Sequence, residues 1–175
     1  MRVCLNAGAM SMYNPAVIAN YFLEKGASES RALTPMQVQK LVYLAHGWHL
    51  GYGFGPLVNE TPEAWKYGPV FRSLYYAMSQ YGGGPVTYLL KTGPDPLDLD
   101  AHVESGRTKD LLDAVWKNYA QFSGFQLSSI THLEGTPWHE AWHILGGKNS
   151  MGFEIGRELI EKYYSGRIEA IRSNG

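Results

Sequence analysis

The sequence predicts a mainly α-helical, compact single domain of about six to seven helices with a small β-sheet or hairpin. Its 175 residues are one domain's length, and 45% of them are hydrophobic, which suffices for a buried core. Apolar residues recur at helical spacing in at least six segments. Residues that begin and end helices bound these segments, so helix is expected to exceed strand several-fold.

The expected helices are placed by their capping residues. The first is expected over 14–26, because an N-cap asparagine and a first-turn proline open it and a glycine ends it. The second is expected over 34–52, where Thr34 and Gln37 form a capping box. Later helices are expected to begin at Gly68-Pro69, Thr108, Ser123 and Thr136, and a last one is expected over 153–165 with Gly166 as its stop.

The remaining segments follow other patterns. Residues 57–67 and 86–90 have short β character and are expected to pair as the small sheet. Residues 91–107 lack periodicity and are expected to form a surface loop. The expected organisation is a flexible leader over 1–12, a helical domain over 13–166 and a C-terminal tail over 167–175.

Composition and charge exclude several classes of protein. The chain carries 15 basic and 16 acidic residues and has no basic stripe, which argues against nucleic-acid binding. No apolar run is long enough for a membrane span, and the N-terminus lacks the apolar region of a signal peptide. Cys4 is the only cysteine, which excludes an internal disulfide and favours a reducing compartment. We therefore expect a cytoplasmic protein.

Two histidine pairs raise the question of a metal site. His46 and His49 are three residues apart, and His139 and His143 are four apart, so each pair shares one side of a helix. Neither pair has the glutamate of a zinc protease motif, and the chain has no serine nucleophile elbow. We expect packing and surface histidines, no metal, no cofactor and no enzyme. A histidine-dependent metal hydrolase stays open as an alternative of another class.

Lys40 and His132 each have more than one interpretation. Lys40 lies at the edge of an apolar arc, where its stem either snorkels along the helix border or places its charge against a neighbouring helix or a partner. Thr131-His132 closes a predicted helix, where a histidine can bond the last carbonyl groups and complement the helix dipole. That structural role is favoured over catalysis.

The stretch 63–70 is the most informative part of the chain. It combines two large aromatic residues, a lysine, a glycine and a proline, and it contains no nucleophile. We expect Trp65 to pack at the edge of the core and the next two residues to lie nearer the surface. Gly68 is expected where a side chain would be strained, and Pro69 is expected to begin a helix. The pattern favours recognition of a partner over transformation of a substrate.

Three segments of the chain match a known family in the family's own order. They are residues 34–48, the stretch 63–70 and residues 127–138, with a closing helix that carries two tyrosines. The motif residues are Lys40, Trp65, Gly68, Pro69, Val70, Thr131, His132 and Trp138. On these residues the chain resembles the Panacea domain family of SocA-like antitoxins and phage-associated proteins, over about residues 14–165.

The resemblance implies a mostly helical antitoxin-like protein that binds and neutralises a cognate toxin. The implied partner is a protein toxin encoded by an adjacent gene, which is neutralised directly or by delivery to a protease. The family supplies no catalytic residue to carry over. An alternative with the same fold is a phage accessory protein that binds a host defence component.

Exposed aromatic and basic side chains are the expected partner-binding residues, because Tyr, Trp and Arg dominate the energetics of protein interfaces. Tyr43 is expected on the polar side of its helix. Tyr67 and Arg72 are expected to flank the start of one helix on a continuous surface; the alternative is that Tyr67 is buried and Arg72 is only solvated. The full set of candidates is Tyr43, Lys66, Tyr67 and Arg72.

Overall fold

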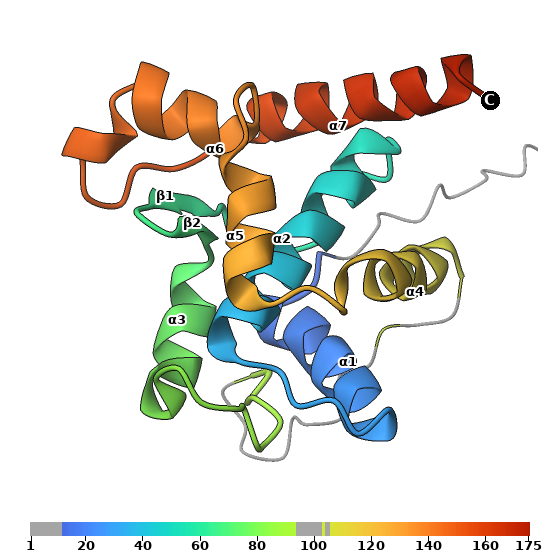
Figure 1. Cartoon of the computed structure of the whole chain (residues 1–175), viewed down its shortest axis with the longest axis vertical. Helices are drawn as coiled ribbons and strands as arrows, with labels where there is room; N and C mark the ends of the chain where they lie inside the picture. The colour runs from blue at the N-terminus through green and yellow to red at the C-terminus, as the bar shows by residue number, and fades with distance from the viewer. Residues whose placement is uncertain (1–11, 94–102, 104–105) are drawn as a thin grey trace, which may run out of the picture.

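The structure, a computed structural model, describes residues 12–93, 103 and 106–175, and this part of the chain forms seven α-helices and one small hairpin (Figure 1). The predicted fold class is confirmed. The α-helices are α1 (Pro15–Ser28), α2 (Pro35–Gly51), α3 (Arg72–Met78), α4 (Arg107–Tyr119), α5 (Gly124–His132), α6 (Pro137–His139) and α7 (Arg157–Ser173). Short 3₁₀ turns cover Ser79–Tyr81 and Gly147–Asn149, and a π-helical turn, Glu140–Ile144, continues α6.

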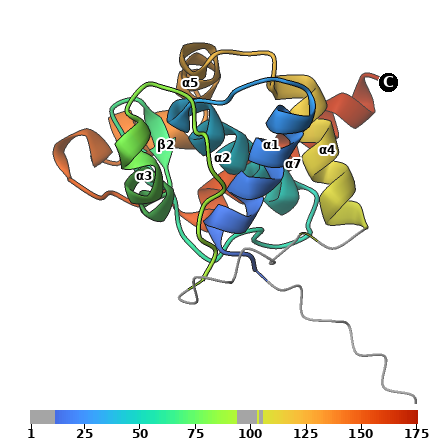
Figure 2. The ribbon, with the colours of Figure 1, turned by 90° about the horizontal axis from the view of Figure 1, so that it is seen from below.

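Helix α2 is the centre of the fold. It packs against α1, α4, α5 and α7, and Figures 1 and 2 show it in the middle of the molecule. All of its residues from Val38 to Gly47 are buried. A helix that is covered on every side places its polar side chains in the core as well, and each of them then needs a partner there.

Two glycines of α2 let α7 approach closely. A Cβ atom at Gly51 would lie 2.6 Å from the Cβ atom of Tyr164, and one at Gly47 would overlap the Tyr164 ring. The Tyr164 ring also lies 5.0 Å from the ring of Trp48. This contact sets the position of α7 across α2, while the C-terminal turns of α7 project beyond the body of the molecule (Figures 1 and 2).

The predicted capping box of Thr34 and Gln37 is confirmed, and the helix expected to begin at Ser123 is capped in the same way. Thr34 Oγ1 accepts a hydrogen bond from the backbone nitrogen of Gln37 at 3.4 Å, and Gln37 Oε1 accepts one from the Thr34 nitrogen at 3.0 Å. Ser123 and Gln126 make the same pair of bonds at 3.3 and 2.8 Å. Local signals therefore determine where α2 and α5 begin.

The sheet differs from the prediction. Strand β1 (Glu63–Trp65) pairs antiparallel with β2 (Gly68–Val70), so the hairpin forms within the stretch 63–70 itself. Residues 86–90, expected as the partner strand, form no strand. Pro69 lies in β2 instead of beginning a helix, because the turn and the returning strand come first and α3 begins after them.

Gly166 does not end the last helix. Helix α7 continues past it, so most of the expected tail over 167–175 is helical. One glycine inside a helix costs only about 1 kcal/mol, which good helix formers and tertiary contacts offset. Ile168 supplies such a contact, because it is buried. Thr108, expected as a cap, lies inside α4, which begins one residue earlier.

Two expectations fall largely outside the described residues. These are the flexible leader over 1–12 and the surface loop over 91–107. Within the part of the chain that the structure describes, no helix combines the length and the apolar character that crossing a membrane requires.

Candidate functional site

The turn of the hairpin requires glycine at position 68. Gly68 has a φ of +107°, a conformation that residues with a side chain rarely adopt. A Cβ atom there would lie 2.7 Å from Lys40 Cε and 3.0 Å from Thr131 Oγ1. Both neighbours are buried, so neither has room to move away. The prediction that a side chain would be strained at this position is confirmed.

Three helices donate hydrogen bonds to the inward carbonyl groups of the hairpin. The bonds are Lys40 Nζ of α2 to Pro69 O at 3.1 Å, Ser128 Oγ of α5 to Tyr67 O at 2.8 Å, and Trp138 Nε1 of α6 to Trp65 O at 2.8 Å. A buried carbonyl group without a donor is costly, so these bonds fix the backbone of the hairpin from inside.

Gln39 extends this support beyond the second strand. Its Nε2 donates to the carbonyl of Phe71 at 2.9 Å, and its Oε1 accepts from the Phe71 nitrogen at 2.9 Å. Gln39 is buried, and both ends of its amide are paired. Four side chains from α2, α5 and α6 therefore bond the segment from Trp65 to Phe71.

Lys40 is a lysine in the core. Its side chain is only 2% exposed, so the snorkelling interpretation is wrong, and its partner is a hairpin carbonyl. Burial lowers the pKa of Lys40 to about 7, because an ammonium group loses its hydration in the core. The amine therefore lies near the boundary between its charged and neutral forms at neutral pH.

His132 and Trp138 stack against one another. Their ring centroids are 3.8 Å apart with an interplanar angle of 16°. The Nε2 atom of His132 has no hydrogen-bond partner among the described residues, and burial lowers the pKa of this imidazole. The expected bond to the last helical carbonyl groups comes instead from Thr136, whose Oγ1 donates to the carbonyl of Thr131 at 2.7 Å.

The outer face of the hairpin presents a tyrosine and two basic residues. Tyr67 is 57% exposed, and Lys66 Nζ lies 5.5 Å from the centroid of its ring. Arg72 makes two bonds to Glu63, Nε to Oε1 at 2.9 Å and Nη2 to Oε2 at 3.0 Å. Although burial raises it, the pKa of Glu63 is held below its ordinary value by hydrogen bonds from Arg72 and Trp65.

Two tyrosines of α3 extend this face. Tyr75 and Tyr76 are both exposed, and their ring centroids are 5.6 Å apart. The Tyr75 ring also lies 4.8 Å from the ring of Trp65, which is half-buried as predicted. We define the hairpin surface as Lys66, Tyr67, Arg72, Tyr75 and Tyr76.

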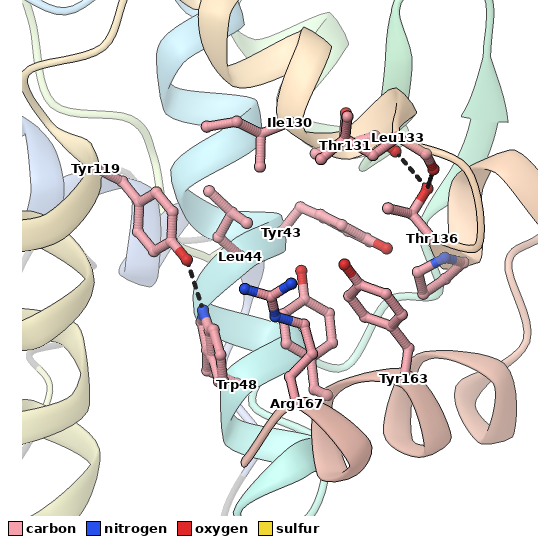
Figure 3. A pocket seen from close by; sticks show the side chains of 12 residues that line it. Tyr43, Leu44, Trp48, Tyr119, Ile130, Thr131, Leu133, Thr136, Tyr163 and Arg167 are labelled. Atoms are coloured by element: carbon pink, nitrogen blue, oxygen red, sulfur yellow. Dashed lines mark hydrogen bonds between the residues drawn. The ribbon is translucent and has the colours of Figure 1, made fainter. Parts of the chain in front are cut away.

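Tyr43 does not belong to this surface. It is only 1% exposed, so the expectation that it lies on the polar side of its helix is wrong. Helix α7 covers that side of α2, which the periodicity of α2 alone could not reveal. Its hydroxyl group lines a separate cavity between α2, α5 and α7 (Figure 3).

The paired histidines of α2 are part of the core. His46 Nδ1 accepts from the backbone nitrogen of Val58 at 3.4 Å, and His49 Nδ1 donates to the carbonyl of Gly55 at 2.7 Å. Burial lowers the pKa of His46 to about 4, so its imidazole is neutral at pH 7. In the described ranges, no group of three or more His, Cys, Asp or Glu side chains is placed to hold a metal ion.

The hairpin brings together the family-motif residues predicted from three distant segments. Sequence reasoning missed Gln39 and Ser128, whose partners are distant in the chain, and the exposed Tyr75 and Tyr76. The signal for Gln39 was a glutamine inside a nearly continuous apolar helix. Ser128 carried no local signal, because serine is common in helices of every environment.

Known proteins match the same part of the chain. The family described as antitoxin SocA-like, Panacea domain, matches residues 38–139, which include the hairpin and the helices that support it. Antitoxin SocA from Caulobacter vibrioides (strain NA1000 / CB15N) is 30% identical over 149 residues, which cover 82% of this chain and 78% of that protein. No solved structure matches the chain significantly. The chain belongs to the SocA-like antitoxin family with a Panacea domain.

Proposed function

We propose that this protein is an antitoxin that neutralises a cognate protein toxin by binding it through the hairpin surface. Membership of the family supports an antitoxin-type role and a role in binding instead of catalysis. One observation carries the choice of surface. The backbone of the hairpin is bonded to three helices on its inner side, while the side chains of Lys66 and Tyr67 lie exposed on the outer side.

A fixed hairpin favours tight binding. A flexible loop loses conformational freedom when a partner orders it, and that loss opposes association. Here the carbonyl groups of Trp65, Tyr67 and Pro69 are already bonded within the protein. The partner would meet a turn whose shape is set before binding.

The chemistry of the hairpin surface suits a protein partner. Tyrosine and arginine are enriched at interface centres, because they bury a large area and keep a polar tip. Tyr67, Tyr75 and Tyr76 supply three such rings, and Lys66 adds a cation beside the first. Arg72 is bonded to Glu63, so its side chain would be held in place and would contribute mainly to the shape of the surface. Direct masking of the toxin and its delivery to a protease would both begin with this contact.

Co-expression tests the proposal. The product of the adjacent gene is expressed alone, with the wild-type chain, and with the double variant Lys66→Ala/Tyr67→Ala. We expect the product alone to stop growth, the wild-type chain to restore it and the double variant to fail. The matched control is Tyr88→Ala/Lys91→Ala, which removes an exposed tyrosine and an exposed lysine outside the hairpin surface. The control should restore growth fully.

Two results would contradict the proposal in different ways. If the double variant is folded, as judged by circular dichroism, and restores growth fully, the hairpin surface is not the binding face. If the product of the adjacent gene is harmless and does not co-purify with the chain, the antitoxin role itself fails. The phage accessory alternative would then take its place.

A further inference from the structure

A second site is built where α2, α5 and α7 meet, on residues that the hairpin surface does not use. A cavity of about 80 Å³ lies there. Figure 3 shows the hydroxyl groups of Tyr43 and Tyr163 pointing toward one another, with the guanidinium group of Arg167 reaching in from α7. Tyr119 and Tyr164 also line the cavity. We call these five residues the tyrosine cavity.

The Tyr43 hydroxyl is the strongest indication of a missing ligand. Its oxygen is fully buried and has no hydrogen-bond partner among the described residues. A buried polar group without a partner is uncommon and costly, and it indicates a bound group that completes it. Burial first, and then the neighbouring Tyr163, raises the pKa of Tyr43, so its O–H group remains a donor at neutral pH.

The donors of the cavity are suited to an anion. The Tyr119 hydroxyl accepts a bond from Trp48 Nε1 at 3.2 Å, which leaves its own proton available to a ligand. The Arg167 guanidinium lies 6.0 Å from the centroid of the Tyr163 ring and adds a positive charge at the mouth. Of the described residues that line the cavity, none carries a carboxylate. Phenol and guanidinium donors without a competing acid are typical of a carboxylate site.

The cavity adjoins a larger groove, which indicates the size of the ligand. An open groove of about 680 Å³ shares Trp48, Tyr119 and Arg167 with the cavity. Its other walls are mainly apolar, with Tyr52, Phe54, Leu111, Val115 and Ile171, and they also hold the polar residues Arg107, Asp110 and Asn118. A free small anion would fill the cavity and leave the apolar groove empty. A polypeptide segment could place one carboxylate in the cavity and apolar side chains in the groove.

We propose that the tyrosine cavity binds the carboxylate of an acidic side chain on a segment of a partner protein, whose neighbouring apolar side chains lie in the adjoining groove. The Tyr43 hydroxyl and the Arg167 guanidinium are its main donors. This site lies outside the hairpin surface, and it does not require the partner to be a toxin. Its failure and the failure of the proposed function are therefore distinguishable.

Titration calorimetry on the full chain tests the proposal with three probes. The first is a blocked tripeptide with glutamate between two leucines, the second is the same peptide with glutamine, and the third is sodium acetate measured against sodium chloride. We expect the glutamate peptide to bind at least about tenfold more tightly than the glutamine peptide, the scale of a hydrogen bond to a charged group. Acetate should bind at the same site as the glutamate peptide, but more weakly than that peptide.

Matched variants locate the binding. Tyr43→Phe and Arg167→Gln should each weaken binding of the glutamate peptide about tenfold. Tyr88→Phe and Arg172→Gln change the same residue types outside both the cavity and the hairpin surface, and both should leave the affinity for the glutamate peptide unchanged. Tyr43→Phe removes only an unpaired hydroxyl, so it is expected to fold, and thermal unfolding checks this.

Four outcomes would overturn the proposal. Equal affinity for the glutamate and glutamine peptides would show that the cavity does not recognise a carboxylate. Acetate binding without peptide binding would reduce the site to one for a free small anion. Unchanged peptide affinity in a folded Tyr43→Phe variant, or no heat above the sodium chloride control with any probe, would leave the unpaired hydroxyl as a feature of folding alone.

Discussion

The hairpin and the tyrosine cavity differ in whether their inward polar groups have hydrogen-bond partners. In the hairpin, the inward carbonyl groups of Trp65, Tyr67 and Pro69 each have a donor from a distant helix. In the cavity, the hydroxyl of Tyr43 is fully buried and has no partner among the described residues. The hairpin carbonyl groups are bonded without a ligand and the hairpin offers exposed side chains, whereas the cavity offers a buried donor that is still unpaired among the described residues.

This difference predicts how mutations in each region will act. Changes on the inner side of the hairpin should cost stability, because each breaks a bond that the fold already makes or adds atoms where there is no space. Changes in the cavity should cost little stability, because they remove a hydrogen bond that would form only when a ligand binds. They should affect binding instead. Four predictions on stability test this contrast, from the largest expected effect to the smallest.

Gly68→Ala should have the largest effect on stability. The added Cβ atom meets Lys40 Cε, which is buried, in a backbone conformation with φ of +107°. We expect the free energy of unfolding to fall by about 3 kcal/mol, the sum of backbone strain and overpacking. Gly53→Ala is the matched control, because Gly53 has φ of +74° and open space around it. Chemical denaturation of both variants separates the cost of backbone strain from the cost of the clash. Equal losses in the free energy of unfolding would show that Lys40 does not restrict the turn.

Lys40 should make stability depend on pH above neutrality. Its pKa is about 7 in the folded protein, below the ordinary value of 10.5, so the unfolded chain binds more protons between these values. The stability should therefore rise with pH across this window, by about 3 kcal/mol between pH 7 and 9.5. Lys40→Met should remove this rise. If the two proteins show the same pH dependence in denaturant titrations, the amine does not titrate as its burial implies.

Ser128→Ala should have a smaller effect. It leaves the carbonyl of Tyr67 without its donor at 2.8 Å, and we expect a loss of about 1 kcal/mol in the free energy of unfolding. Ser129→Ala is the control on the same helix, because Ser129 is exposed and bonds only the carbonyl of Phe125 within α5. A loss no larger than that of the control would show that the bond from α5 does not support the hairpin.

Tyr43→Phe should have the smallest effect on stability. It removes a buried hydroxyl that has no partner among the described residues, so we expect a change within about 0.5 kcal/mol, or a slight gain. Thermal unfolding without added ligand measures it. A loss above about 1 kcal/mol would show that the hydroxyl is bonded in the unliganded protein, and the contrast between the two regions would then fail.

The parts of the fold that sequence predicted are those that local signals determine. Thr34 with Gln37, and Ser123 with Gln126, form their capping boxes within four consecutive residues. The same locality explains the error at Pro69. A proline after a glycine is typical of a helix start, and only pairing with β1 reveals it as part of a strand.

The candidate site was predicted in part. The family resemblance identified Lys40, Gly68 and Trp138, but not that they meet at one hairpin through bonds between distant segments. Tyr43 was misplaced because α2 is buried on all sides, so its polar and apolar faces cannot be told apart by periodicity. Tyr67 was expected nearer the surface than Trp65, and it is exposed, but the hairpin turn that exposes it was not predicted.

Affinity for the product of the adjacent gene tests the central proposal most directly. Calorimetry compares the wild-type chain, Lys66→Ala/Tyr67→Ala and the control Tyr88→Ala/Lys91→Ala. If the hairpin surface is the binding face, the double variant should bind about a hundredfold more weakly, which corresponds to about 2.7 kcal/mol, and the control should bind like the wild type. A folded double variant with wild-type affinity would contradict the assignment of this surface.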